Sequence, residues 1–172
     1  TNCDGVSVME QRYSRGKPDY PLRFKENSEV RGTAVTFKPD AEIFDETVFD
    51  YDTLLLRLRE QAFLNAGLRI YLADRRPGEE KEDDLWYDGG IKSFVTFLNN
   101  NKTPLHEEII YMAGQKDDSF AEVALQYNTG YNELLLSFAN NINTQEGGKH
   151  LIGFTMGLVA SVKDQLAKAL MQ

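Results

Sequence analysis

Residues Arg57–Arg76 read RLREQAFLNAGLRIYLADRR, and the periodicity of this stretch changes at a glycine, Gly67. Before the glycine, apolar residues recur at helical spacing, so that Leu58 and Ala62 fall on one side. Residues 68–72 then alternate apolar and polar side chains, which is the period of a half-covered β-strand. The stretch therefore predicts a helix that a left-handed glycine ends, followed directly by a strand.

The same patterns extend the prediction to the rest of the chain. The first helix follows Asp50 or Asp52 as a cap, a second follows Gly89-Gly90, and a last one follows Gly147-Gly148. The other predicted strands are residues 8–13, 33–37, 109–113, 120–127 and 132–138. The last three are expected to form a meander, because turn-rich segments join them. Mixed helices and hairpins without steady βαβ alternation predict an α+β fold.

The charge balance is acidic, with 27 acidic against 19 basic residues and a formal net charge of −8. Such a balance argues against a chain that binds phosphate backbones nonspecifically along its whole surface. Much of the excess lies in the run Glu79–Asp84, which holds five acids and one lysine. We interpret this run as a solvated hairpin or loop tip, because a calcium loop needs alternating carboxylates and a glycine at its bend.

The sequence also limits where the protein works. It holds no run of eighteen apolar residues and no charged-then-apolar leader, so we expect neither a membrane span nor a secretory signal. Cys3 is the only cysteine, which excludes an internal disulfide framework and fits a reducing compartment. We therefore expect a cytoplasmic protein with no membrane partner.

Residues suited to catalysis or metal binding are sparse. His106 and His150 lie far apart, and Cys3 at the other end of the chain completes no metal or nucleophile set by spacing. Both glycine pairs precede helices, where free backbone N–H groups could hold an anion, but neither matches a phosphate-loop spacing. A tight helix entry is the favoured interpretation of each pair. We predict no catalytic residue and no metal site.

Several long blocks of the chain resemble the B subunit of bacterial DNA gyrase, with the corresponding topoisomerase IV subunit as the close alternative. The blocks fall in the order of that family, and they are RGTAVTFKPDAEIF, YDTLLLRLREQAFLNAGLRIYLADRR, YDGGIKSFVTFLNNNKTPLH, EVALQYNTGY and SFANNINTQEGGKHLIGF. The resemblance implies the end of a GHKL-type ATPase domain, residues 1–78, followed by the first part of a transducer domain, residues 79–172. The transducer would have the fold of the second domain of ribosomal protein S5.

The resemblance also implies partners and cofactors. The whole subunit would bind ATP and Mg²⁺, dimerise, and act on DNA together with a gyrase A-type subunit. This segment would relay the nucleotide state and contribute to the DNA gate. Within it, Arg57 and Arg59 are expected to form surface or interdomain salt bridges rather than to contact DNA. The alternative is a stand-alone noncatalytic dimerisation or protein-binding module with the same fold.

The chain departs from the family at its ATP site. The motifs that carry the general-base glutamate, the adenine-reading aspartate and the glycine-rich lid have no counterpart here, and we expect no ATPase activity from this segment alone. Cys3 stands where relatives often carry an arginine. Thr33 alone matches an ATP-pocket position, the threonine that helps hold the adenine-side aspartate and its water, although an ordinary strand role for it stays open.

The last helix carries an apolar stripe that can cover a sheet. We expect this helix to dock on the meander by burying Leu151, Phe154, Leu158 and Val162. The resemblance implies a further strand beyond this helix, without which one sheet edge or apolar face would stay uncovered. We therefore expect the chain to self-associate through its transducer half, by edge pairing or by exchange of the C-terminal helix.

Overall fold

The computed structural model describes residues 1–171, which form two compact units that divide after Asp50. This division differs from the domain boundary expected between residues 78 and 79. That expected boundary lies in the turn of a paired hairpin within the second unit. The last residue of the expected second domain, Gln172, lies outside the described residues. The division of the family into ATPase and transducer parts therefore stays a prediction.

The first unit, residues 1–50, consists of two small antiparallel pairs. Strand β1 (Ser7–Glu10) pairs with β4 (Arg23–Asn27), and β2 (Tyr13–Ser14) pairs with β3 (Lys17–Pro18). The strand predicted over residues 8–13 is thus divided into two short ones. The strand predicted over residues 33–37 is wrong, because the bridge formed at this point joins Gly32 to Asn2 and no described strand pairs with the five residues after it.

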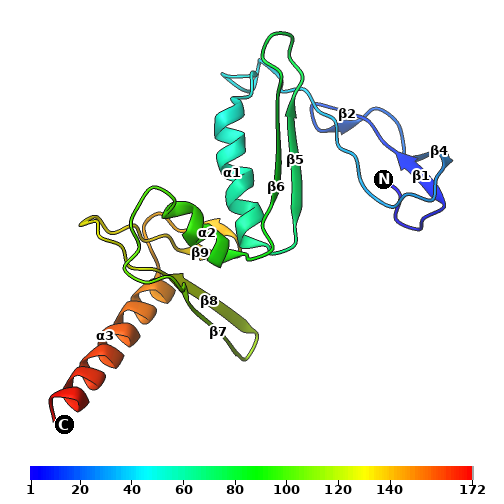
Figure 1. Cartoon of the computed structure of the whole chain (residues 1–172). Helices are drawn as coiled ribbons and strands as arrows, with labels where there is room; N and C mark the ends of the chain where they lie inside the picture. Colours follow the sequence, from blue (N-terminus) through cyan, green and yellow to red (C-terminus); the bar gives the residue numbers. More distant parts are fainter. Residues whose placement is uncertain (172) are drawn as a thin grey trace. The chain divides into compact units, whose positions relative to one another are not determined.

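The second unit begins with the helix and strand that the opening stretch predicts. Helix α1 (Tyr51–Leu64) is followed by Gly67, whose φ of 83° is the expected left-handed conformation. Strand β5 (Arg69–Asp74) then pairs along its whole length with β6 (Lys81–Trp86). Figure 1 shows this hairpin lying alongside α1, against which both of its strands pack. The helix-to-strand prediction is confirmed.

The acidic run is only partly a loop. Residues 75–80 connect the two strands, but Lys81–Trp86 is strand β6, so the acids at positions 82–84 lie on a strand. Asp83 and Asp84 find partners on the neighbouring elements, in Tyr51 and Arg69. The run therefore lies on a hairpin, as predicted, but Asp83 and Asp84 act as structural partners rather than as purely solvated charges.

The rest of the second unit contains two helices and two more hairpins. Helix α2 (Ile91–Leu98) follows Gly90, strand β7 (Ile110–Lys116) pairs with β8 (Ser119–Leu125), and β9 (Phe138–Ala139) pairs with β10 (Ile142–Asn143). The predicted three-stranded meander is wrong, because residues 132–137 form no strand and β7–β8 is a separate two-stranded ribbon. The α+β fold class itself is confirmed.

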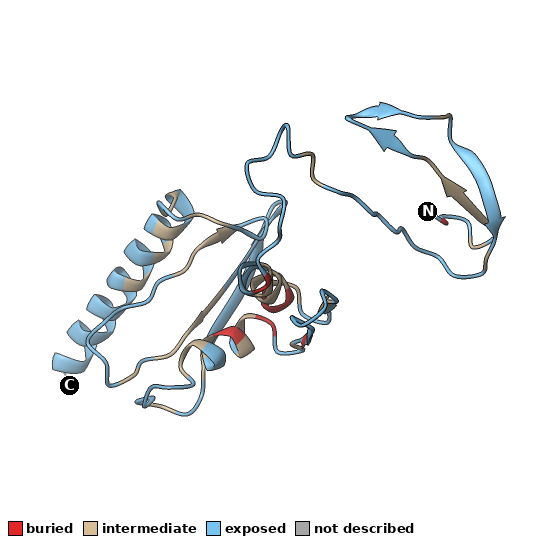
Figure 2. Cartoon of the chain, turned by 90° about the horizontal axis from the view of Figure 1, so that it is seen from above, coloured by how far each residue is buried: buried red, intermediate tan, exposed pale blue. Residues whose placement is uncertain are grey.

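Helix α3 (Lys149–Leu170) is the longest element, and it begins where the second glycine pair predicts. None of its residues is buried, and Val162, which was expected to dock on a sheet, is 48% exposed. In Figure 2 buried residues gather on α1 and α2, whereas α3 is exposed or half-buried along its length. The expected docking of α3 is therefore wrong for this structure. Among residues 1–171, no helix is apolar enough over sufficient length to cross a membrane.

Candidate functional site

Thr33, the one residue expected to contact ATP, lies in the first unit on an exposed segment. Its hydroxyl oxygen is 2.9 Å from that of Thr1, and the preceding Gly32 exchanges two backbone hydrogen bonds with Asn2, of 2.7 and 3.0 Å. Asn2 is only 5% exposed, and its side chain donates to the carbonyl of Ser28 and accepts from the amide of Gly5. These bonds fix the backbone before Thr33, whose hydroxyl is exposed and shares a hydrogen bond with that of Thr1.

The residues at the start of the chain form a closed turn. The carboxylate of Asp4 accepts hydrogen bonds from the amides of Val6 and Ser7, both 2.8 Å, and these two bonds lower the pKa of Asp4. Cys3 is exposed, with its sulfur 3.5 Å from the hydroxyl of Thr1. The turn thus uses its acid as a structural acceptor.

The second unit is organised by a cluster of aromatic rings between α1 and α2. Phe63 of α1 stacks on Tyr87 at 3.7 Å and on Phe94 at 4.8 Å between ring centroids, and it meets Phe97 at 5.4 Å. Phe63 is 1% exposed. Phe138 of β9 extends the cluster, with its centroid 6.4 Å from that of Phe94. The cluster joins α1, the residue after β6, α2 and β9 into one packed unit.

Gly90 has a packing role at the entry of α2. Its φ is +55°, and a β-carbon there would lie 3.3 Å from the β-carbon of Ala66, at the end of α1. At the other pair, the ring of His150 covers Gly148, 2.6 Å from where a β-carbon would stand. The geometry supports tight helix entries at both pairs, as favoured from the sequence.

Ionic and polar contacts reinforce the packing of α1 on the hairpin. The buried Tyr51 donates a 2.7 Å hydrogen bond to Asp83, and burial together with this bond raises the pKa of Tyr51 to about 12. Arg59 lies 3.8 Å from the other carboxylate oxygen of Asp83 and over the ring of Phe97. Arg57 pairs with Glu60 on its own helix. Both arginines therefore form the expected ion pairs, and the expectation that they do not contact DNA stays a prediction.

The hairpin itself is held by paired charges. Arg69 of β5 binds Asp84 of β6 through two guanidinium nitrogens. At the end of β5, Arg76 donates to Asp74 from its side chain and its backbone, which lowers the pKa of Asp74 to about 2. Most of the acids in this region therefore act as structural partners. No group of three or more His, Cys, Asp or Glu side chains among residues 1–171 is arranged to hold a metal ion.

The two histidines also have structural positions. His106 contacts the carbonyl of Glu108 through Nδ1 at 2.6 Å and accepts the amide of Tyr127 at Nε2, 3.0 Å away. Gln126 donates to the carbonyl of His106 and accepts a hydrogen bond from Asn99, which follows α2. These contacts fasten the loop after α2 to the end of β8, a connection that spacing in the sequence does not indicate.

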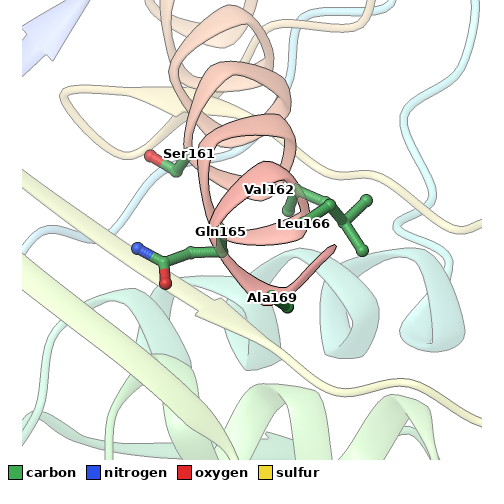
Figure 3. Close-up of a pocket in the computed structure, with 5 residues that line it drawn as sticks. All are labelled: Ser161, Val162, Gln165, Leu166 and Ala169. Atoms are coloured by element: carbon green, nitrogen blue, oxygen red, sulfur yellow. The ribbon is translucent and has the colours of Figure 1, made fainter. Parts of the chain in front are cut away.

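Helix α3 carries a shallow hollow of about 490 Å³. Figure 3 shows that one helix supplies its whole lining, Ser161, Val162, Gln165, Leu166 and Ala169. The lining is largely apolar and carries no charged side chain.

Comparisons with known proteins place these features in a family. The family model described as DNA gyrase B matches residues 90–171. The DNA gyrase B subunit of Clostridium acetobutylicum is 49% identical over 162 residues, which are 94% of this chain and 25% of that protein. The corresponding protein of Staphylococcus epidermidis is 50% identical over 153 residues, 88% of this chain and 24% of that protein. The chain thus spans about a quarter of the length of these relatives.

Solved structures agree. The 43K ATPase domain of Thermus thermophilus gyrase B, in complex with an aminocoumarin, matches with a TM-score of 0.81 and 34% identity, over 98% of this chain and 46% of that one. The gyrase B subunit of Myxococcus xanthus matches with a TM-score of 0.81 and 26% identity, over 95% of this chain and 48% of that one. The chain belongs to the DNA gyrase B family.

Proposed function

We propose that the chain works as part of a type II DNA topoisomerase B subunit, which couples ATP binding and hydrolysis to DNA strand passage and supercoiling. Identity of about half to gyrase B subunits over most of the chain supports this proposal. The complete subunit would use ATP and Mg²⁺, form a homodimer, and act on DNA with a gyrase A-type subunit in the cytoplasm.

Within that subunit, this segment would relay the nucleotide state from the ATPase part to the transducer part and contribute to the DNA gate. The observation that carries the proposal is the aromatic cluster around Phe63. Because close-packed rings transmit displacement rather than absorb it, a shift of α1 would also move α2 and β9. The expected division at residues 78 and 79 would place α1 on the ATPase side and α2 on the transducer side.

Thr33 would contribute to the nucleotide site of the complete subunit. Its exposed hydroxyl, held next to Thr1, is available to bind on the adenine side of ATP. In a B subunit that carries this sequence, Thr33→Ala is expected to weaken ATP affinity by roughly tenfold, as loss of one buried hydrogen bond predicts. Thr33→Ser keeps the hydroxyl and serves as the matched control. Equal affinity of all three proteins would contradict the role of Thr33.

The segment alone would not hydrolyse ATP. The general-base glutamate, the adenine-reading aspartate and the lid of the family have no counterpart in these residues, so ATP affinity is expected to be no tighter than about millimolar. Calorimetric titration with a nonhydrolysable ATP analogue measures this directly. Micromolar binding would contradict it.

The relay is tested by loosening the aromatic cluster at its edge. Phe97 is 43% exposed, so Phe97→Ala is expected to preserve the fold while weakening the contact between α1 and α2. In a complete B subunit assembled with its A-type partner, this variant should lower the number of supercoils introduced per ATP hydrolysed. Phe120→Ala, at an exposed ring on β8, is the control. Unchanged coupling in Phe97→Ala would refute the relay.

A further inference from the structure

The turn between β9 and β10 is attached to the C-terminal end of α1. The side chain of Gln61 donates to the backbone carbonyl of Asn141 at 3.0 Å, and the side chain of Asn141 donates to Oδ1 of Asn65 at 2.9 Å. Asn65 in turn donates to the carbonyl of Gln61 at 2.8 Å, which fixes its orientation on the helix. Figure 1 shows β9 beside this end of α1. Residues about eighty positions apart are thus joined by side-chain amides.

The conformation of the turn positions Asn141 for this contact. Asn140 and Asn141 have φ angles of 48° and 64°, between the paired residues Ala139 and Ile142. A two-residue hairpin with both central residues left-handed is a tight turn, and asparagine tolerates this conformation better than most residues. The side chain of Asn141 is therefore presented to α1 by a constrained backbone.

The same hairpin is attached to the start of α3. Thr144, directly after β10, exchanges hydrogen bonds with Ser137, directly before β9. The carbonyl of Thr144 accepts the amide of Gly147 at 2.8 Å, and its hydroxyl lies 3.5 Å from the ring of His150, in the first turn of α3. Polar contacts therefore attach the β9–β10 hairpin to α1 through Asn141 and to the start of α3 through Thr144, and the paired backbone of the hairpin connects the two ends.

We propose that Asn141 is a positioning residue that couples the end of α1 to the first turn of α3. This inference rests on the proposed function, since it identifies a route by which the segment would pass the position of α1 onward. The aromatic cluster connects α1 to α2 and β9, whereas Asn141 adds a directional contact between α1 and the β9–β10 hairpin, whose Thr144 contacts the start of α3. Contacts between neighbouring residues do not by themselves demonstrate such coupling. The test must show that a change at the end of α1 alters the start of α3.

Hydrogen exchange of the 172-residue chain, without nucleotide, tests the inference. The reporters are the amides of Gly147 and Ile152, which donate to Thr144 and Gly148 at the start of α3. Asn141→Gly keeps the left-handed turn and removes the contact with Asn65. It is expected to speed exchange at both reporters by about fivefold, as loss of one ordinary hydrogen bond predicts.

The matched control is Asn140→Gly, in the same turn and also at positive φ, at a position with no side-chain hydrogen bond to another described residue. It should leave exchange at both reporters unchanged within about twofold. Asn141→Asp, which keeps the size of the side chain but replaces its amide donor by a carboxylate, should act as Asn141→Gly does. This second variant keeps the test valid if glycine loosens the hairpin.

The double variant Asn65→Ala, Asn141→Gly completes the test. If the two residues act through one contact, the double variant should exchange no faster at the reporters than the faster single variant, because the effects are not additive. Faster exchange near Asn65 with no change at Gly147 and Ile152 would overturn the inference, as would additive effects. This experiment uses no nucleotide, so it tests only the contact through Asn141. Failure of the relay itself would be seen separately, in the number of supercoils introduced per ATP hydrolysed.

Discussion

Phe63 is the residue on which the packing of the second unit depends most. It is 1% exposed and contacts three other aromatic rings, one directly after β6 and two on α2. Phe63→Ala would remove those contacts and leave a cavity between rigid neighbours, so we expect it to lower the free energy of unfolding by about 3–5 kcal/mol. Urea denaturation measures the change. Phe120→Ala, at a ring that is 64% exposed, should change it by less than about 1 kcal/mol, and equal losses would contradict the prediction.

Tyr51 is expected to make the free energy of unfolding of the second unit depend on pH in the alkaline range. Burial and the hydrogen bond to Asp83 raise its pKa to about 12, whereas the phenol of the unfolded chain titrates near 10. The unfolded state therefore releases its proton first, so the contribution of Tyr51 is fully present below pH ~10 and lost by pH ~12. Measurements of the free energy of unfolding between these two pH values should show this decline. Tyr51→Phe should have a shallower pH dependence, and identical slopes would exclude the assignment.

The acidic hairpin combines structural and solvated charges at the scale of one element. Asp83 binds Tyr51 and lies near Arg59, whereas Glu80 accepts a hydrogen bond from the backbone amide of Gly78 in the exposed turn. Asp83→Asn should lower the free energy of unfolding by about 1–2 kcal/mol, because it weakens a charge-assisted hydrogen bond. Glu80→Gln should stay within about 0.5 kcal/mol. Thermal denaturation of the two variants side by side decides whether the strand acids stabilise the fold.

Elements with a strong internal period could be predicted from the sequence, and elements that depend on a distant partner could not. The helices at α1, α2 and α3 and the strands β5, β7 and β8 follow from apolar spacing and glycine punctuation. Residues 33–37 and 132–138 are also rich in β-branched, aromatic or leucine side chains, yet most of them have no strand to pair with among the described residues. A strand-like composition favours an extended segment, but it does not provide the neighbouring strand.

The site was predictable only where a resemblance indicated it. Thr33 was proposed from its match to a family position, and its role in ATP binding stays a prediction; the structure adds its hydroxyl contact with Thr1. The contact of Asn141 with Gln61 and Asn65 joins residues about eighty positions apart and depends on two positive φ angles, which no local pattern reports. Such contacts depend on tertiary packing.

At the scale of the whole molecule, exposed apolar surface favours association. Helix α3 buries none of its residues, and strands β7 and β8 pair only with each other, so each has an open edge in the described structure. We expect the chain to self-associate through residues 79–172 without nucleotide, by edge pairing or exchange of α3. Light scattering over a concentration series, with and without ATP, measures this. A strict monomer at high concentration, or association that requires ATP, would refute it.

The central claim is that this segment passes the nucleotide state from one part of a gyrase B-type subunit to another. The most direct test is hydrogen exchange of a complete B subunit carrying this sequence, with and without a nonhydrolysable ATP analogue. We predict slower exchange not only near Thr33 but also in α2 and in residues 138–150, which the aromatic cluster and Asn141 connect to α1. Changes that stop within residues 1–50 would contradict the claim.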